Sequence, residues 1–148
     1  MEAGTSSVVE CEVRIDAAPE TVFEFFTDPV KAVRWMGDDA TLDPRPGGIY
    51  KVAMNEQYVA IGEYVEVDPP HHLSFTWGWK DDLERMPPGS STVDITLEPD
   101  GDATVVRLVH SGIPTQAAAD SHRGGWNRFL PRLAIVAAGG DPDKEENA

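Results

Sequence analysis

The sequence predicts an α+β fold: a curved antiparallel sheet of six to seven strands around one long C-terminal helix, with two short helices after the first strand. Short segments of alternating apolar and polar residues follow one another between residues 8 and 111. Turn residues separate most of these segments at hairpin spacing, which favours antiparallel pairing. The segment from Gln116 to about Ala138 instead carries apolar residues at helical spacing, so it predicts a helix long enough to cover one face of the sheet.

The first strand and the two short helices are predicted before residue 38. Apolar and polar residues alternate over residues 8–15, as in a half-buried strand. Pro19 is typical of the first turn of a helix, and Asp28-Pro29 ends that helix. The segment VKAVRWMG, residues 30–37, predicts a second short helix that ends at its glycine.

Six further strands are expected before the long helix. Turn signals such as PGG, NEQ, DPPHH and DGD separate them. The expected strands occupy residues 40–44, 49–54, 58–67, 73–79, 91–99 and 103–111.

The alternation also assigns side chains to the two faces of the sheet. It places Leu73, Phe75, Trp77 and Trp79 on one face of their strand. It places Ile61, Glu63, Val65 and Val67 together in the same way, so Glu63 points inward if that face is concave. A slip of one residue would exchange the two faces.

The expected long helix carries an aromatic stripe and an internal proline. His122, Trp126, Phe129 and Leu133 recur at helical spacing. Pro131 lacks the amide that would bond the carbonyl group of Asn127, so a kink is expected there.

Composition bounds the class of protein. A chain of 148 residues that is 41% hydrophobic predicts one folded domain, expected over residues 8–138, with disordered ends at 1–7 and 139–148. The net charge of −14 argues against nucleic acid and anionic membrane surfaces as partners.

No apolar stretch of membrane-spanning length and no secretory signal pattern is visible, so a cytoplasmic location is expected. One cysteine and scattered histidines predict no metal site, and no motif points to a cofactor.

Several motifs in order resemble a known superfamily. They are IDAAPETVFEFFTDP, RWMG, PGGIY, GEYVEVDPPHHLSFTW and HRGGWNRFLPRLA, which together span about residues 15–134. The chain resembles the helix-grip, START-like (SRPBCC) proteins, and more narrowly the branch named after the activator of heat-shock protein 90 ATPase. The resemblance implies the helix-grip fold and a cavity between helix and sheet. It also implies one of three kinds of role: binding of a hydrophobic ligand, cyclase or hydrolase chemistry, or, from the name of the branch, chaperone modulation in a stress response.

Ten residues are candidates for lining that cavity. The aromatic ones would supply apolar area, although core packing alone would also explain them. Two histidines and one carboxylate would orient a polar group or transfer a proton, unless the histidines are satisfied core residues and the carboxylate pairs with an arginine such as Arg107. His71 and His72 follow two prolines in a turn and are expected to be exposed. The ten candidates are Trp35, Met54, Glu63, Phe75, Trp77, Trp79, His110, His122, Trp126 and Phe129.

Function stays open among three classes at this point. Binding of a small hydrophobic molecule is favoured, because the candidates are mostly apolar. An enzyme using the same cavity would need Glu63 and His110 to face one substrate atom, and no catalytic residue is assigned. A module that modulates a chaperone or another protein would have a filled core and an exposed apolar patch. A homodimer is also left open.

Overall fold

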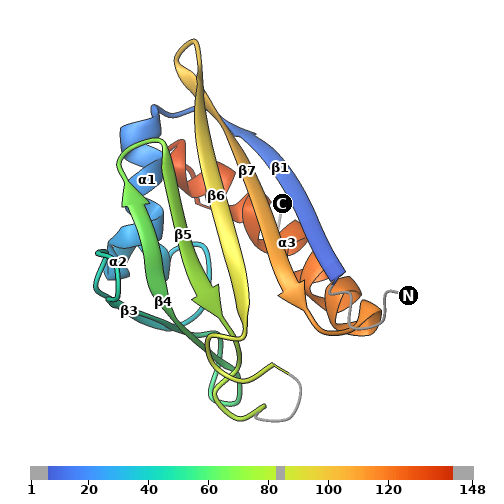
Figure 1. Ribbon diagram of the computed structural model, residues 1–148. Helices are drawn as coiled ribbons and strands as arrows, with labels where there is room; N and C mark the ends of the chain where they lie inside the picture. Colours follow the sequence, from blue (N-terminus) through green and yellow to red (C-terminus); the bar gives the residue numbers. More distant parts are fainter. Residues whose placement is uncertain (1–6, 83–85, 142–148) are drawn as a thin grey trace.

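The computed structural model describes residues 7–82 and 86–141. Seven antiparallel strands form one sheet in the order β1-β7-β6-β5-β4-β3-β2 (Figure 1). The strands are β1 Ser7–Ile15, β2 Asp39–Leu42, β3 Ile49–Ala53, β4 Val59–Asp68, β5 His72–Trp77, β6 Ser91–Asp100 and β7 Ala103–Ile113. The helices are α1 Pro19–Thr27, α2 Pro29–Ala32 and α3 Gln116–Ala137. The predicted α+β class, with a curved sheet and one long C-terminal helix, is confirmed.

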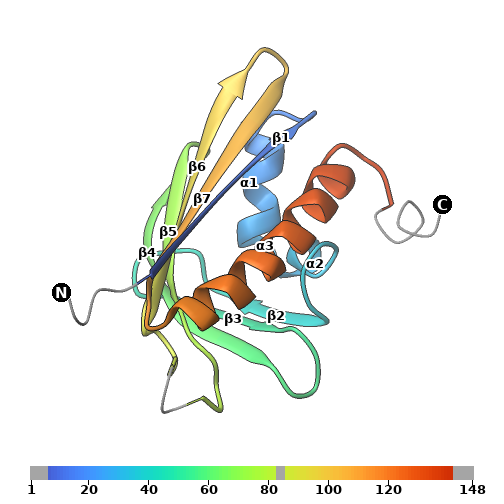
Figure 2. The ribbon, with the colours of Figure 1, turned by 90° about the vertical axis from the view of Figure 1, so that its right-hand side faces the viewer.

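The long helix α3 crosses one face of the sheet and makes most of its contacts with that sheet along β1 (Figure 2). Helices α1 and α2 lie against the same face (Figure 2). Because the sheet curves and a helix is a straight cylinder, α3 cannot pack flush against all seven strands. Space therefore remains on the side of β3, β4 and β5.

The core lies between α3 and the concave face of the sheet. The residues predicted to share one face of β5 are buried, among them Leu73 and Phe75, and Ile95 of β6 is buried beside them. Leu130 and Leu133 of α3 are buried as well and belong to the same apolar cluster. Buried residues thus recur at every second position on the strands and at helical spacing on α3, and both sets pack into one core.

The second short helix is shorter than the sequence predicts. Asp28 ends α1 and begins α2, where its carboxylate accepts a hydrogen bond from the amide of Val30 at 2.9 Å. Helix α2 then ends at Ala32 instead of Gly37. After the end of α2, Trp35 is buried in the core, where its indole N–H donates to the carbonyl oxygen of Phe25 at 2.9 Å.

A β-bulge in β4 reverses the predicted orientation of Glu63. The register of β4 against β5 shifts between Tyr64 and Glu66. Before the bulge, Tyr64 faces the core and Glu63 is exposed, whereas Val67 packs against the core after it. One extra residue exchanges the two faces of a strand. The predicted alternation therefore assigns Val67 to the correct face and Glu63 to the wrong one.

Helix α3 has a defined cap at each end. The Thr115 hydroxyl accepts a hydrogen bond from the amide of Ala118 at 3.0 Å. At the other end the amides of Gly139 and Gly140 donate to carbonyl groups of the last turn, with Gly139 at φ +96°. These two glycines, expected in the tail, thus finish the helix. Ser7, also expected in a disordered end, begins β1. Residues 1–6 and 142–148 lie outside the described residues.

Pro131 does not interrupt α3, which continues to Ala137. The expected kink stays a prediction.

Candidate functional site

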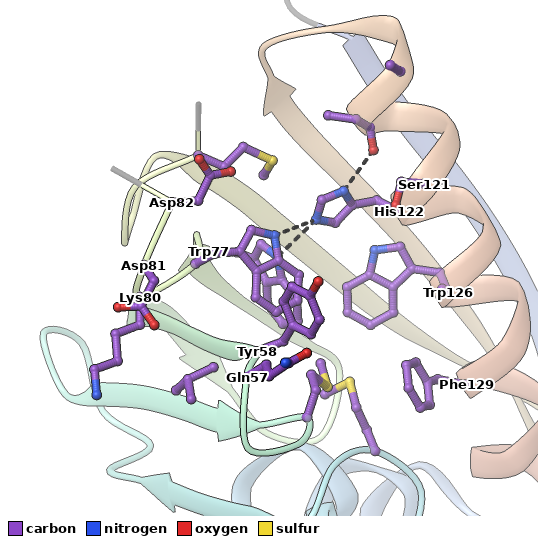
Figure 3. A pocket seen from close by; sticks show the side chains of 18 of the residues that line it. Gln57, Tyr58, Trp77, Lys80, Asp81, Asp82, Ser121, His122, Trp126 and Phe129 are labelled. Carbon is purple, nitrogen blue, oxygen red and sulfur yellow. Dashed lines mark hydrogen bonds between the residues drawn. The ribbon is translucent and has the colours of Figure 1, made fainter. Parts of the chain in front are cut away.

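A cavity of about 830 Å³ lies beneath the first half of α3. The turn between β3 and β4, the end of β5 and the segment after β5 form its other walls (Figure 3). Rings and thioethers make up most of the inner surface, so we call it the aromatic cavity. These ring and thioether residues are Met36, Met54, Met86, Tyr58, Trp77, Trp79, His122, Trp126 and Phe129.

Six of the ten sequence candidates line the aromatic cavity: Met54, Trp77, Trp79, His122, Trp126 and Phe129. Sequence reasoning missed Tyr58, which is 57% exposed and whose ring lies edge-on to Trp79 at 6.2 Å. The sequence around Tyr58, beside a turn, does not indicate that this residue lines a cavity, because its contact with Trp79 depends on the antiparallel bridge between Ala60 and Trp79. Met36, Met86, Gln57, Lys80 and Ser121 were missed as well.

The other four candidates do not line it. The ring of Phe75 stacks on Tyr50 at 3.9 Å between centroids and is core. Trp35 is buried against α1 and lines a different cavity. His110 is fully buried, and Glu63 is exposed. Arg107 pairs with Glu12 and Glu98, so the expected alternative partner of Glu63 is also wrong.

His122 holds two tryptophans of the cavity wall. Its Nδ1 lies 2.8 Å from the carbonyl oxygen of Ala118, which can only accept, so Nδ1 carries the proton. Its Nε2 therefore accepts, and it receives the indole N–H groups of Trp77 and Trp79, each at 3.3 Å (Figure 3). Burial lowers the pKa of His122, while the hydrogen bond to Ala118 opposes the shift.

His110 lies behind the wall in a chain of hydrogen bonds. Trp126 Nε1 donates to His110 Nδ1 at 3.1 Å, so the His110 proton is on Nε2 and is donated to Ser91 Oγ at 2.8 Å. The Ser91 hydroxyl in turn donates to the carbonyl oxygen of Trp77 at 2.7 Å. Burial, and secondarily the nearby His122, lower the pKa of His110 to about 3. Both histidines are neutral near neutral pH.

The indole and imidazole nitrogens at the cavity wall are therefore already paired within the protein. All three indole N–H groups of the wall donate to histidines, and both nitrogens of each histidine are engaged. Within residues 7–82 and 86–141, no buried side-chain nitrogen or oxygen lacks a hydrogen-bond partner. The inner wall thus offers ring faces and thioethers to a ligand, and polar groups occur at the rim.

A second cavity of about 590 Å³ adjoins the aromatic cavity. It shares Met36, Met54 and Phe129 with the aromatic cavity. Its charged lining residues are Arg128, Arg132 and Asp38, so we call it the arginine cavity.

The remaining histidines lie away from both cavities. His71 is exposed as expected. The prediction for His72 is wrong: its side chain is only 23% exposed, because Asp94 and Glu66 of the neighbouring strands pair with its ring nitrogens. In the described part of the chain, no three His, Cys, Asp or Glu side chains are grouped to hold a metal ion. No described helix is long and apolar enough to cross a membrane.

Solved structures share this architecture. An AHSA1-like protein from Rhizobium etli is 43% identical, with a TM-score of 0.75, over 96% of this chain and 89% of its own. An HSP90 activator from Plasmodium falciparum is 24% identical, with a TM-score of 0.72, over 90% and 96%. The Aha1 dimer from Colwellia psychrerythraea is 20% identical, with a TM-score of 0.76, over 90% and 98%. The latter two likenesses show the fold alone.

The comparison with family models is more specific. No curated protein matches the chain. The family model described as Activator of Hsp90 ATPase homolog 1-like protein matches residues 16–138. That match covers every described element except β1, and it agrees with the resemblance found in the sequence motifs. The chain belongs to the Activator of Hsp90 ATPase homolog 1-like family.

Proposed function

We propose that this protein binds a small, largely apolar molecule in the aromatic cavity. The observation that carries the proposal is a cavity of about 830 Å³ whose three tryptophan N–H groups all donate to histidines, so that the rings offer apolar surface to a ligand. That volume falls in the usual range for ligand sites, which are mostly apolar. Burying about 200 Å² of apolar ligand surface contributes about 5 kcal/mol before the costs of association, which is compatible with micromolar affinity.

Enzyme chemistry of the cyclase or hydrolase type is less well supported. It would need an acid or base facing the substrate. Glu63 is exposed on the far face of the sheet, and His110 is fully buried with both nitrogens bonded. The one histidine of the wall, His122, already accepts two indole N–H groups at the nitrogen that would have to act. Binding without catalysis is therefore the simpler use of this cavity.

Gly125 offers a direct test, because it lines the cavity and a side chain there has room. A Cβ built on Gly125 meets no atom within 4 Å, and the same holds for its neighbour Gly124, which does not line the cavity. We expect Gly125→Leu to fill part of the cavity and weaken binding of the neutral fluorescent probe N-phenyl-1-naphthylamine at least about tenfold. Helix propensity predicts that its thermal stability is kept or raised, since glycine is the poorest non-proline residue in a helix interior.

Gly124→Leu is the matched control, because it makes the same change on an exposed part of the same turn. We expect this variant to bind the probe as the unmodified protein does. Equal probe binding by both leucine variants would contradict the proposal, as would no saturable binding by the unmodified protein. Fluorescence titration and thermal unfolding of the three proteins separate loss of binding from loss of folding.

Chaperone modulation is a second candidate, favoured by the family to which the chain belongs. It predicts that the chain stimulates the ATPase of an Hsp90 chaperone, and that Gly125→Leu leaves this stimulation unchanged. A homodimer and a cytoplasmic location stay predictions. Light scattering of the purified protein measures the oligomeric state directly.

A further inference from the structure

On the basis of the proposed ligand binding, we infer that the ligand carries an anionic group, which Arg128 binds in the arginine cavity while the apolar body fills the aromatic cavity. The ligand class is thus an amphiphilic acid: an apolar body with one carboxylate, sulfonate or similar group. The charges on the two cavities, the wall between them and the position of Arg128 support this inference.

The two cavities differ in the kind of charged residues that line them. Among the described lining residues, the aromatic cavity has Lys80 against two aspartates, Asp81 and Asp82. The arginine cavity has Arg128 and Arg132 against Asp38. In a chain of net charge −14, arginines that line a cavity are groups to which an anion is attracted.

The wall between the two cavities is short and adaptable. Met36, Met54 and Phe129 line both of them. Unbranched thioether side chains have several accessible rotamers and repack around different shapes. A ligand body in the aromatic cavity therefore needs to pass only these three side chains to bring a polar end to the other side.

Arg128 is placed at this wall with its donors available. Its guanidinium carbon lies 6.0 Å from the ring centroid of Phe129, the residue common to both cavities. A planar guanidinium that contacts a ring keeps N–H donors for a carboxylate or sulfonate. None of the ion pairs among the described residues involves Arg128, whereas Arg123 on the same helix pairs with Asp120 at 2.9 Å. Arg132 follows one turn later and lines the same cavity.

Two fluorescent probes that differ by one anionic group test the inference. They are N-phenyl-1-naphthylamine, which is neutral, and 8-anilinonaphthalene-1-sulfonate, which adds a sulfonate to the same rings. We expect Arg128→Gln to weaken binding of the sulfonate probe about tenfold and to leave the neutral probe unchanged, because one charge-assisted contact is lost. Added salt should weaken only the sulfonate probe.

Arg123→Gln is the control, because it removes the same charge from the same helix but from a residue that lines neither cavity. We expect it to leave the affinity for both probes unchanged, and Gly125→Leu to weaken both, since one cavity holds both ring systems. Equal loss of sulfonate binding in the Arg123 and Arg128 variants would overturn the inference. So would no loss in Arg128→Gln, or sulfonate binding that survives Gly125→Leu.

The two proposals fail in different ways. If the neutral probe does not bind the unmodified protein, the proposed function is wrong, and the anionic-ligand inference fails with it. If the neutral probe binds and is excluded by Gly125→Leu, but Arg128→Gln leaves the sulfonate probe unaffected, only the role of Arg128 is wrong.

Discussion

Trp77→Ala is expected to lower the free energy of unfolding by about 3 to 5 kcal/mol, the usual range for truncating a buried aromatic side chain. Trp77 is only 2% exposed. Its ring lies 5.3 Å from those of Trp79 and Trp126, and close to both histidines. Alanine would leave a void that this rigid set of rings cannot fill. Urea unfolding at neutral pH measures the loss.

Trp79→Ala is the matched comparison, because both tryptophans donate the same hydrogen bond to His122. Trp79 is only partly buried, so its truncation should destabilise the protein by about 1 to 2 kcal/mol. It lines the aromatic cavity, so we expect it to weaken probe binding while the protein stays folded. Equal destabilisation by the two substitutions would contradict the difference in burial between these two wall tryptophans.

Lowering the pH from about 7 to about 5 is expected to reduce the free energy of unfolding by about 2 kcal/mol through His110 alone. The pKa of His110 is about 3 in the folded protein, against 6.5 as the ordinary value in an unfolded chain. Between these values the unfolded chain takes up a proton that the folded protein excludes, so stability falls as the pH falls. His122 contributes with the same sign, because burial lowers its pKa too.

His110→Gln isolates this contribution. An amide can donate to Ser91 and accept from Trp126 as the imidazole does, but it does not titrate. We expect the loss of stability between about pH 7 and about pH 5 to be about 2 kcal/mol smaller in this variant than in the unmodified protein. Urea unfolding of both proteins at the two pH values measures the difference. Parallel pH profiles would show that His110 does not control acid stability.

Local patterns predicted much of the candidate site as well as the fold. Alternation over residues 73–79 placed Trp77 and Trp79 on the inner face, and helical spacing placed His122 and Trp126 on one stripe of α3. These residues are joined across two elements that the sequence places far apart. Their convergence could be expected from the fold class, but the hydrogen bonds between them could not.

The positions of other residues depend on features of the fold that no local sequence pattern indicates. Glu63 was misplaced because a bulge in β4 adds one residue to the alternation. Phe75 faces inward as expected, but its stacking on Tyr50 makes it core and keeps it out of the cavity lining. Tyr58 reaches the cavity only because Ala60, two residues later in β4, bridges Trp79.

The sequence by itself determined the class of fold, the order of its elements and which faces are apolar, because periodicity, turn residues and helix ends are local properties of the chain. The tertiary structure decided where the cavities lie, which apolar residues line them and which polar atoms remain for a ligand. Those properties depend on the curvature of the sheet, on the path of α3 along β1 and on the pairing of indole and imidazole groups between α3 and the strands. These features depend on distances between residues that are remote in sequence, and only the packing of the folded chain sets those distances.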